Sequence, residues 1–402
     1  MRKGELESRL IVLVTLGLVA FGLVMVYSAT SAAAALGNGD PSSYLKRQAV
    51  YALLGIGLLI GASRLDYLKL KALAPPLVLS SLGLCVLVLV TGTQVNGARR
   101  WLALGPATFQ PSELAKLALA VWVAAYLARR RAPRTLRELV RPIGLLAALF
   151  CGLILLEPDL GTVIAIVVML TAVVLVAGTP VRPLAAAAAL AGTLALLAIW
   201  IEPYRRARVF SFLHPWHDAQ GAGFQTVQAL IGLGSGGLFG EGLGHGVQKV
   251  FYLPEAHTDM IFAIVGEELG LVGAAALIAA YATFAYAGLR IALRCRDPFG
   301  KALASGMTML VCGQAAINIA AVMGLAPLTG IPLPFVSYGG SSLIVALAAV
   351  GVLLNIAVGD GGEAKARVPD RSRRNSGARP SGPRRRGSAQ PPRRAGHVRG
   401  LA

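Results

Sequence analysis

Residues 252–270 read Tyr252-Leu-Pro-Glu-Ala-His-Thr-Asp-Met-Ile-Phe-Ala-Ile-Val-Gly-Glu-Glu-Leu-Gly270, and within them a polar loop runs into a long apolar segment. Five ionisable side chains fall in this stretch: Glu255, His257, Asp259, Glu267 and Glu268. Because ionisable groups are costly at membrane depth, a cluster of them marks a functional site by default. We expect the chemistry to lie where this loop meets its helix, with Glu267 and Glu268 holding the helix bundle or cavity in shape.

The composition is that of a protein that crosses a membrane many times. Hydrophobic residues make up 55% of the chain and charged residues 14%, whereas a soluble domain carries about 25% charged residues. Apolar runs near the length of a spanning helix predict ten spans, at residues 10–32, 47–63, 73–92, 112–128, 142–157, 159–178, 184–201, 260–289, 302–324 and 340–358. The predicted fold is an all-α polytopic membrane protein, with about ten transmembrane helices in residues 1–359.

The basic residues predict how the spans are oriented. One set of loops holds 17 Lys and Arg residues before the C-terminal tail, and the opposite set holds eight. Since cytoplasmic loops are enriched in Lys and Arg, we expect both termini to be cytoplasmic. The residues of chemical interest then lie outside, in the loops 91–111, 202–258 and 325–339 and in the turn Glu157-Pro-Asp159. Any catalytic or binding site is expected to face outward.

Much of the net charge of +19 lies in the tail, residues 360–402, which holds twelve Lys and Arg against three Asp and Glu and is rich in Pro, Gly and Ser. Such a composition cannot bury a core, so we expect disorder. A basic cytoplasmic tail beside a span is attracted to anionic lipid. Docking to a protein is the alternative, and nucleic acid is not an expected partner.

The first outer loop and the helix after it carry unusual charges. Arg99 and Arg100 lie on the outer side and are expected to meet an anionic partner. The neighbouring Trp101 is explained equally well as an aromatic anchor at the membrane interface. Glu113 and Lys116 share one face of the next helix. An ion pair there is either structural or, as we expect, part of the lining of a polar cavity.

The extracytoplasmic loop 202–258, between the seventh and eighth helices, is 57 residues long. A loop of this length is functional or contains short helices. A basic run that ends at Arg208 precedes aromatic residues typical of a membrane interface. Gly236, Gly240 and Gly244 have the spacing of closely packed backbone.

Residues 325–342, before the tenth helix, are apolar but contain three prolines. They cannot form a regular helix, and irregular backbone at membrane depth is tolerated only where protein or a cavity covers it. We expect a re-entrant segment that ends in the cluster Ser337-Tyr-Gly-Gly-Ser-Ser342.

Glu255, His257 and Asp259 alternate, so an extended segment would place all three on one side. That arrangement permits a divalent cation, Mg²⁺ or Mn²⁺, but one His and two carboxylates do not establish a metal site. Alternatively Asp259 begins the next helix, where the helix dipole favours an acid. As a catalyst it would be a general base that takes a proton from a hydroxyl nucleophile. Hydrolase, zinc-protease and ATPase motifs do not occur in the sequence.

Four motifs resemble those of the SEDS family (shape, elongation, division and sporulation), the bacterial polytopic cell-wall polymerases. They are Asn96-Gly-Ala-Arg-Arg-Trp101, Gln110-Pro-Ser-Glu-Leu-Ala-Lys116, Tyr252-Leu-Pro-Glu-Ala-His-Thr-Asp259 and Gly330-Ile-Pro-Leu-Pro-Phe-Val-Ser-Tyr-Gly-Gly-Ser-Ser342. Their order and spacing are similar to the family's over about residues 10–358. The glycine-rich run and the segment before Asp259 look more like the division branch than the elongation branch. Met260 departs from the family's usual Phe.

The resemblance implies a peptidoglycan glycosyltransferase in the bacterial cytoplasmic membrane. Its substrate would be lipid II, the undecaprenyl-pyrophosphate-linked disaccharide peptide, polymerised at the outer face. Asp259 matches the family's essential loop aspartate, which would deprotonate the acceptor hydroxyl. The expected substrate contacts are Trp101, Arg99, Arg100, Glu113, Lys116, Arg208, Glu255, His257 and Ser341. Among these, the arginines are assigned to the pyrophosphate on their charge.

The expected protein partners are a class B penicillin-binding transpeptidase and other divisome membrane proteins. Three alternatives remain: a lipid II flippase, the elongation-type paralogue, and a scaffold that recruits a partner through its tail. A flippase needs no base beside a hydroxyl, whereas a polymerase does. A pure scaffold has no use for the costly intramembrane charges of Glu113, Lys116, Glu267 and Glu268.

Overall fold

The computed structural model describes residues 4–35, 41–95, 98–105, 107–201, 203–221, 223–250 and 253–366. Residues Met1–Glu363 belong to one compact unit, and Ala364–Ala402 to a second. The last helix continues through Ala366, beyond the boundary predicted at residue 359. The predicted disorder of the tail concerns residues that lie mostly outside the described ranges.

The expected spans coincide with helices. The long helices are α1 Glu5–Ala35, α2 Pro41–Arg64, α3 Leu70–Thr91, α4 Pro111–Arg129, α6 Leu145–Leu156, α7 Leu160–Val176, α8 Val181–Ile201, α11 Ile261–Arg294, α12 Pro298–Val322 and α13 Gly340–Ala366. Within the described residues, nine helical stretches are long and apolar enough to cross a membrane, and α7 is a shorter apolar helix at the place of the remaining predicted span. The predicted helical membrane fold is confirmed.

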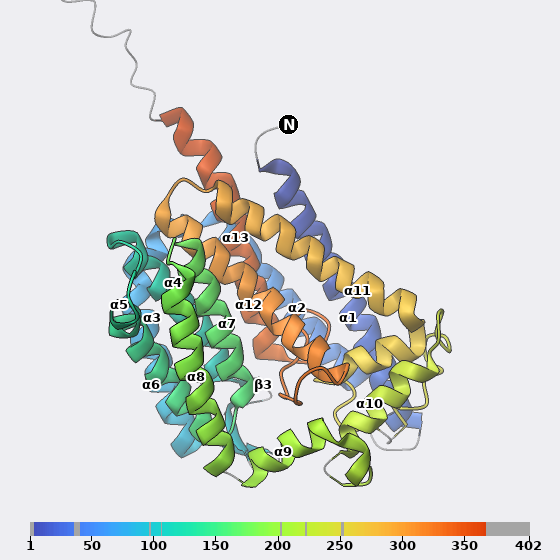
Figure 1. Cartoon of the computed structure of the whole chain (residues 1–402). Helices are drawn as coiled ribbons and strands as arrows, with labels where there is room; N and C mark the ends of the chain where they lie inside the picture. The colour runs from blue at the N-terminus through green and yellow to red at the C-terminus, as the bar shows by residue number, and fades with distance from the viewer. Residues whose placement is uncertain are drawn as a thin grey trace, which may run out of the picture. The chain divides into compact units, whose positions relative to one another are not determined.

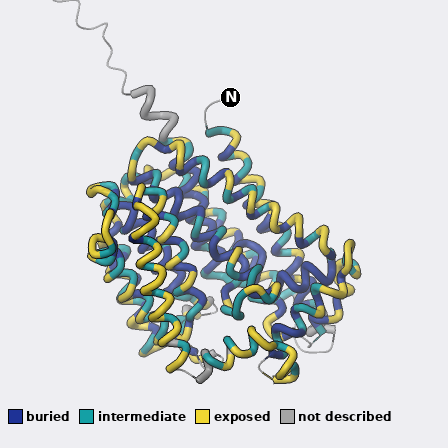
Figure 2. Tube along the Cα trace, viewed as in Figure 1, coloured by how far each residue is buried: buried dark blue, intermediate teal, exposed yellow. Residues whose placement is uncertain are grey.

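Helices α11 and α12 form the centre of this unit. They pack against each other, α1 packs along α11, and α4 and α7 pack against α12 (Figure 1). Burial follows this arrangement, since α4 and α12 are mostly buried while α8 is largely exposed (Figure 2). Apart from Arg182 and Thr193, the exposed side chains of α8 are apolar, as a surface that faces lipid requires.

The loops 91–111 and 202–258 contain more regular structure than predicted. Residues 91–111 include a three-stranded antiparallel sheet, with β1 Thr93–Val95, β2 Ala98–Leu104 and β3 Ala107–Phe109 in the order β1-β2-β3. The all-α prediction therefore missed this small sheet. The turn predicted at Asn96-Gly97 lies outside the described residues. The long loop contains α9 Pro203–Leu213, η3 Pro215–Asp218 and α10 Phe224–Ser235, which confirms the predicted short helices. Shorter helices η1 Tyr67–Lys69, α5 Leu136–Leu139 and η2 Val140–Gly144 precede α3 and α6.

The glycine-rich segment packs tightly against the first turns of α11. A Cβ atom at Gly236 would lie 2.0 Å from the carbonyl oxygen of Gly266, and one at Gly240 would lie 2.2 Å from that of Glu268. The predicted close backbone packing is confirmed at these two positions. It is wrong at Gly244, where a Cβ would meet nothing within 4 Å and the residue instead has φ +85°.

Candidate active site

Asp259 lies in a series of turns that precede α11. Residues 254–260 form turns, Met260 caps the helix and α11 begins at Ile261. The extended arrangement that would align Glu255, His257 and Asp259 is therefore wrong. Glu255 has φ +56° and is exposed, whereas Asp259 is half-buried just before the helix. The described residues contain no group of three His, Cys, Asp or Glu side chains placed to hold a metal ion.

The carboxylate of Asp259 lies beside the irregular segment 325–339. A Cβ atom at Gly330 would lie 3.9 Å from Asp259 Oδ2. The hydroxyl of Thr258 lies 3.3 Å from Asp259 Oδ1. Segment 325–339 has no helix or strand, which confirms the irregular backbone predicted for it. The structure thus brings together two of the sequence motifs, the one ending in Asp259 and the one beginning with Gly330.

Two amide side chains of α12 hold this segment in place. Asn318 Nδ2 donates to the main-chain oxygen of Asp259 at 2.7 Å and to that of Ile331 at 2.8 Å. Gln314 Nε2 donates to the main-chain oxygen of Pro332 at 3.0 Å. Neither residue was singled out from the sequence. The sequence feature that could have identified them is a pair of polar side chains one helical turn apart in an otherwise apolar span.

His257 packs into an aromatic cluster. Its ring centroid lies 4.9 Å from that of Tyr44 and 5.7 Å from that of Tyr338, and the two tyrosine rings lie 5.2 Å apart. The main-chain N–H of Tyr338 also donates to the main-chain oxygen of His257 at 2.9 Å. Burial lowers the pKa of His257, an effect that the charge of Glu255 partly opposes. The imidazole is therefore neutral at physiological pH and joins α2, the Asp259 turn and the 325–339 segment.

Glu113 and Lys116 form an enclosed ion pair. Lys116 Nζ lies 2.9 Å from Glu113 Oε1, and only 2% and 3% of the two side chains is exposed. Lys116 also donates to Gln314 Oε1 at 2.7 Å. The predicted shared face is confirmed, but the expected lining of an open polar cavity is wrong. Both side chains are packed between α4 and α12.

The two loop arginines have different surroundings. Arg100 donates through Nε to the main-chain oxygen of Glu157 at 2.9 Å, and it also bonds the main-chain oxygen of Pro158. It therefore ties β2 to the α6–α7 connector, and its expected anionic partner is replaced by carbonyl oxygens. Arg99 is exposed and Trp101 is half-buried. Strand β2 bulges at Arg100, because Arg99 is paired with Gln94 and Trp101 with the adjacent Thr93 of β1.

The connector carboxylates have opposite environments. Asp159 caps α7, accepting from the Thr162 N–H at 3.0 Å and from Gln110 Nε2 at 3.2 Å. Glu157 is completely buried, and its carboxylate oxygens have no hydrogen-bond partner among the described residues. Burial first, and the charge of Asp159 second, raise the pKa of Glu157 to about 8, while Arg100 opposes the rise. Glu157 therefore keeps its proton at neutral pH, and neither carboxylate is simply solvated.

Two further predicted contacts can be placed in the chain. Ser341 Oγ accepts from the Gln110 N–H at 3.1 Å and donates to the Thr108 oxygen at 3.1 Å, so it joins the start of α13 to the residues before α4. Arg208 belongs to α9, and its side chain lies outside the described residues.

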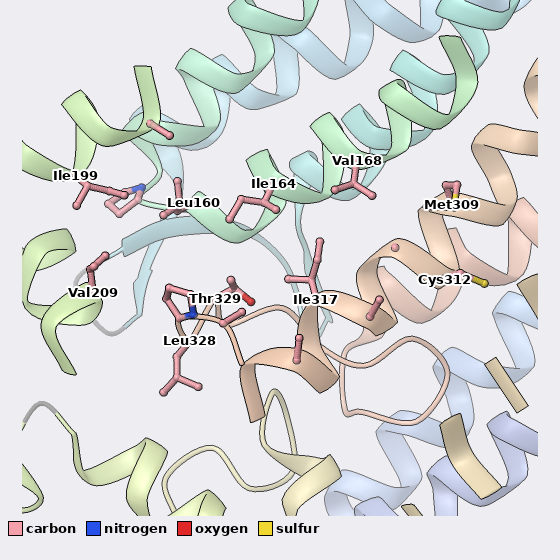
Figure 3. Close-up of a pocket in the computed structure, with 17 residues that line it drawn as sticks. Leu160, Ile164, Val168, Ile199, Val209, Met309, Cys312, Ile317, Leu328 and Thr329 are labelled. Atoms are coloured by element: carbon pink, nitrogen blue, oxygen red, sulfur yellow. The ribbon is translucent and has the colours of Figure 1, made fainter. Parts of the chain in front are cut away.

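An apolar cavity of about 510 Å³ opens between α7, α8, α9, α12 and residues 326–329 (Figure 3). Leu160 and Ile164 line it from α7, and Ile317 lines it from α12. Its lining ends at Thr329, the residue before Gly330, which lies against Asp259. Two consecutive residues of the 325–339 segment therefore border the two features: Thr329 lines the cavity and Gly330 lies beside the Asp259 carboxylate. The sequence showed the apolar helices but not the gap between them.

The comparisons with known proteins cover nearly the whole membrane unit. The pattern of a cell cycle protein family, FtsW/RodA/SpoVE, matches residues 8–360. A probable peptidoglycan glycosyltransferase FtsW of Geobacter sulfurreducens is 41% identical over 355 residues, which is 88% of this chain and 95% of that protein. Stage V sporulation protein E of Bacillus subtilis is 40% identical over 353 residues, 86% of this chain and 96% of that protein.

Two solved structures of related proteins are also similar to this chain. A chain of a peptidoglycan synthase complex, described for its coordination of polymerization and crosslinking, has a TM-score of 0.72 and 32% identity, covering 87% of this chain and 97% of that one. The crystal structure of the rod shape determining protein RodA of Thermus thermophilus has a TM-score of 0.64 and 34% identity, covering 87% and 95%. The resemblance predicted from the four motifs is confirmed: the chain belongs to the FtsW/RodA/SpoVE family of cell cycle proteins.

Proposed function

We propose that this protein is a peptidoglycan glycosyltransferase that polymerises lipid II into glycan strands. Its relatives at about 40% identity are named as glycosyltransferases of this kind. The observation that carries the proposal is the apolar cavity whose lining ends one residue from the contact between Gly330 and Asp259. A polyprenyl chain needs an apolar groove, and the sugar at its end needs a base. The cavity and Asp259 supply both.

In this mechanism Asp259 is the general base. Its carboxylate takes the proton of the acceptor's hydroxyl as that oxygen attacks the anomeric carbon of the donor. The new glycosidic C–O bond forms while the bond from the anomeric carbon to the pyrophosphate breaks, and undecaprenyl pyrophosphate leaves with the electron pair. The half-buried position of Asp259 before α11 leaves the carboxylate accessible to substrate while its backbone is held from behind by Asn318.

The substrate contacts are revised by the packing. Arg99 is exposed and Trp101 is half-buried, and both remain proposed contacts, for the pyrophosphate and a sugar. Arg208 remains a proposed contact on charge alone. Arg100 is engaged by main-chain carbonyls, so it shapes the connector.

The protein is proposed to lie in the bacterial cytoplasmic membrane, with both termini cytoplasmic and Asp259 on the outer face. The asymmetry of basic loops supports this orientation. A class B penicillin-binding transpeptidase is the proposed partner, because a similar solved chain belongs to a complex that couples polymerisation with crosslinking. A role in division is supported by the relatives named FtsW. The tail is proposed to contact anionic lipid and divisome membrane proteins.

The test uses the purified full chain with its cognate transpeptidase, reconstituted in vesicles with labelled lipid II. A polymerase converts the label into glycan chains that are resolved by gel electrophoresis. A flippase moves intact lipid II between leaflets without lengthening it, which a leaflet-specific probe of the same vesicles detects. Translocation without glycan chains would overturn the proposal.

A further inference from the structure

We infer that Asn318 and Gln314 are positioning residues that hold the Asp259 turn against the 325–339 segment, and that the Glu113–Lys116 ion pair acts through Gln314 instead of touching substrate. This inference rests on the proposed function for its effect on the reaction. The hydrogen bonds that support it are independent of that function.

Asn318 bridges two backbone segments that lack regular secondary structure. A side-chain amide has two N–H donors, and both go to main-chain oxygens, of Asp259 at 2.7 Å and of Ile331 at 2.8 Å. Buried main-chain oxygens need partners, and neither a helix nor a sheet supplies them here. Ile331 follows Gly330, which faces the Asp259 carboxylate. One side chain, 2% exposed, therefore sets the separation between the base and the segment beside it.

Gln314 holds the next carbonyl of the same segment from one helical turn away. Its Nε2 donates to the Pro332 oxygen at 3.0 Å and lies 3.3 Å from Ser342 Oγ. Prolines at 332 and 334 remove two N–H groups, so the segment has few means of bonding to itself. Two adjacent carbonyls, of Ile331 and Pro332, are thus fixed by one face of α12.

Lys116 determines which end of the Gln314 amide faces the segment. Its ammonium donates to Gln314 Oε1 at 2.7 Å, which turns Nε2 toward Pro332. Without the ammonium, the amide can rotate and present its oxygen to the Pro332 carbonyl, where two acceptors repel. Glu113 keeps Lys116 paired inside the bundle at 2.9 Å. The ion pair is too enclosed to reach substrate, yet it is connected to the Asp259 turn through Gln314 and the 325–339 segment.

The experiment measures kcat, KM for lipid II and the pH profile, using the full chain with its transpeptidase. Asn318→Ala is expected to lower kcat by about ten- to a hundredfold, because small misplacements of a catalytic group have effects of this size. KM stays within about twofold, and the acidic limb of the pH profile moves because the carboxylate's surroundings change. The matched control is Ser305→Ala, which removes a buried hydroxyl of α12 that has no partner among the described residues.

Variants of the second residue pair separate positioning from binding. Lys116→Met and Gln314→Ala are each expected to lower kcat with KM unchanged. Because the two residues act through one network, the kcat of the double variant is expected to be about the same as that of either single variant. Gln314→Glu keeps a partner for Lys116 but replaces the donor toward Pro332 by an acceptor, so it is expected to lower kcat as well. A raised KM with unchanged kcat in Lys116→Met would show that Lys116 binds substrate and would overturn the inference.

Hydrogen exchange of main-chain amides in residues 325–339 provides a readout that does not depend on activity. Asn318→Ala is expected to accelerate this exchange, and Ser305→Ala is not. If the wild-type protein makes no glycan chains, the proposed function is wrong, but hydrogen exchange still tests whether Asn318 positions the 325–339 segment. Unchanged exchange and unchanged kcat in Asn318→Ala would defeat the positioning inference alone.

Discussion

The ammonium of Lys249 lies 2.7 Å from the carboxylate of Glu268, with 3% and 0% of the two side chains exposed. Ser28 of α1 also donates to this carboxylate at 2.7 Å. On the neighbouring residue, Glu267 accepts from the Val247 N–H at 2.7 Å. The two acids predicted to hold the helix bundle or cavity in shape therefore fasten the end of the loop 202–258 to α11 and α1.

Removing one partner of the buried pair is expected to destabilise the protein strongly. Lys249→Met leaves the Glu268 carboxylate buried without its counter-charge, which costs about 3–5 kcal/mol. The matched control is Glu5→Gln, which breaks the exposed pair with Arg9 and costs about 0–1 kcal/mol. Thermal unfolding in detergent measures both, and equal midpoints for the two variants would contradict the assignment.

Glu157 is expected to make stability fall as pH rises. The pKa of Glu157 in the folded protein is about 8, against 4.5 for an ordinary glutamate. The unfolded chain therefore releases this proton first, and the stability present below the unfolded pKa is lost as pH rises through the folded one. The side chain of Glu157→Gln cannot titrate. The thermal midpoint of this variant, measured relative to that of the wild type, should therefore rise as pH increases from about 5 to about 9. A constant difference across this range would refute the buried, protonated state.

The first turn of α7 is expected to tolerate no side chain at Gly161. A Cβ atom there would lie 2.7 Å from the Thr329 oxygen and 2.6 Å from Ile331 Cγ1. Gly161→Ala should push the 325–339 segment away and cost about 1–3 kcal/mol. Gly152→Ala is the control, since a Cβ at that position of α6 meets nothing within 4 Å. Glycan synthesis and thermal unfolding are measured for both, and indistinguishable variants would show that the segment yields freely.

Filling the apolar cavity is expected to weaken the use of lipid II. Ile317→Trp adds bulk to the cavity lining and should raise KM for lipid II by about tenfold, which corresponds to about 1.4 kcal/mol of lost binding. Leu79→Trp, on an exposed position of α3, adds the same ring elsewhere and should leave KM unchanged. If the first variant keeps the wild-type KM, the lipid chain lies in another place.

The helices were predictable because long apolar runs leave a spanning chain few alternatives. The sheet was not, since β1 and β3 have three residues each and their pairing depends on neighbours that a short polar loop does not reveal. Arg100 shows a second limit. Its charge predicted an anionic partner, but main-chain carbonyl oxygens bind it. Every residue has a main-chain carbonyl, so the sequence does not indicate which ones will accept a hydrogen bond from an arginine.

Asp259 could be singled out from the sequence, but its supports could not. Asn318 lies 59 residues from Asp259 and 13 from Ile331, and nothing in its own span indicates which carbonyls it bonds. The same cost argument that drew attention to the buried acids applies to a buried amide, although more weakly because it carries no charge. His257 had the spacing of a metal ligand and proved to be a packed ring, since the turns after Leu253 abolish the alternation on which that idea depended.

Glycan formation from labelled lipid II by Asp259→Asn, measured beside wild type and Glu241→Gln, tests the central claim most directly. Asn keeps the size of the side chain but cannot take a proton, so no chains are expected from it, while its thermal unfolding matches the wild type. Glu241, an exposed carboxylate of the loop that precedes α11, should be replaceable without loss. Glycan chains from Asp259→Asn at the wild-type rate would contradict the assignment of Asp259 as the base.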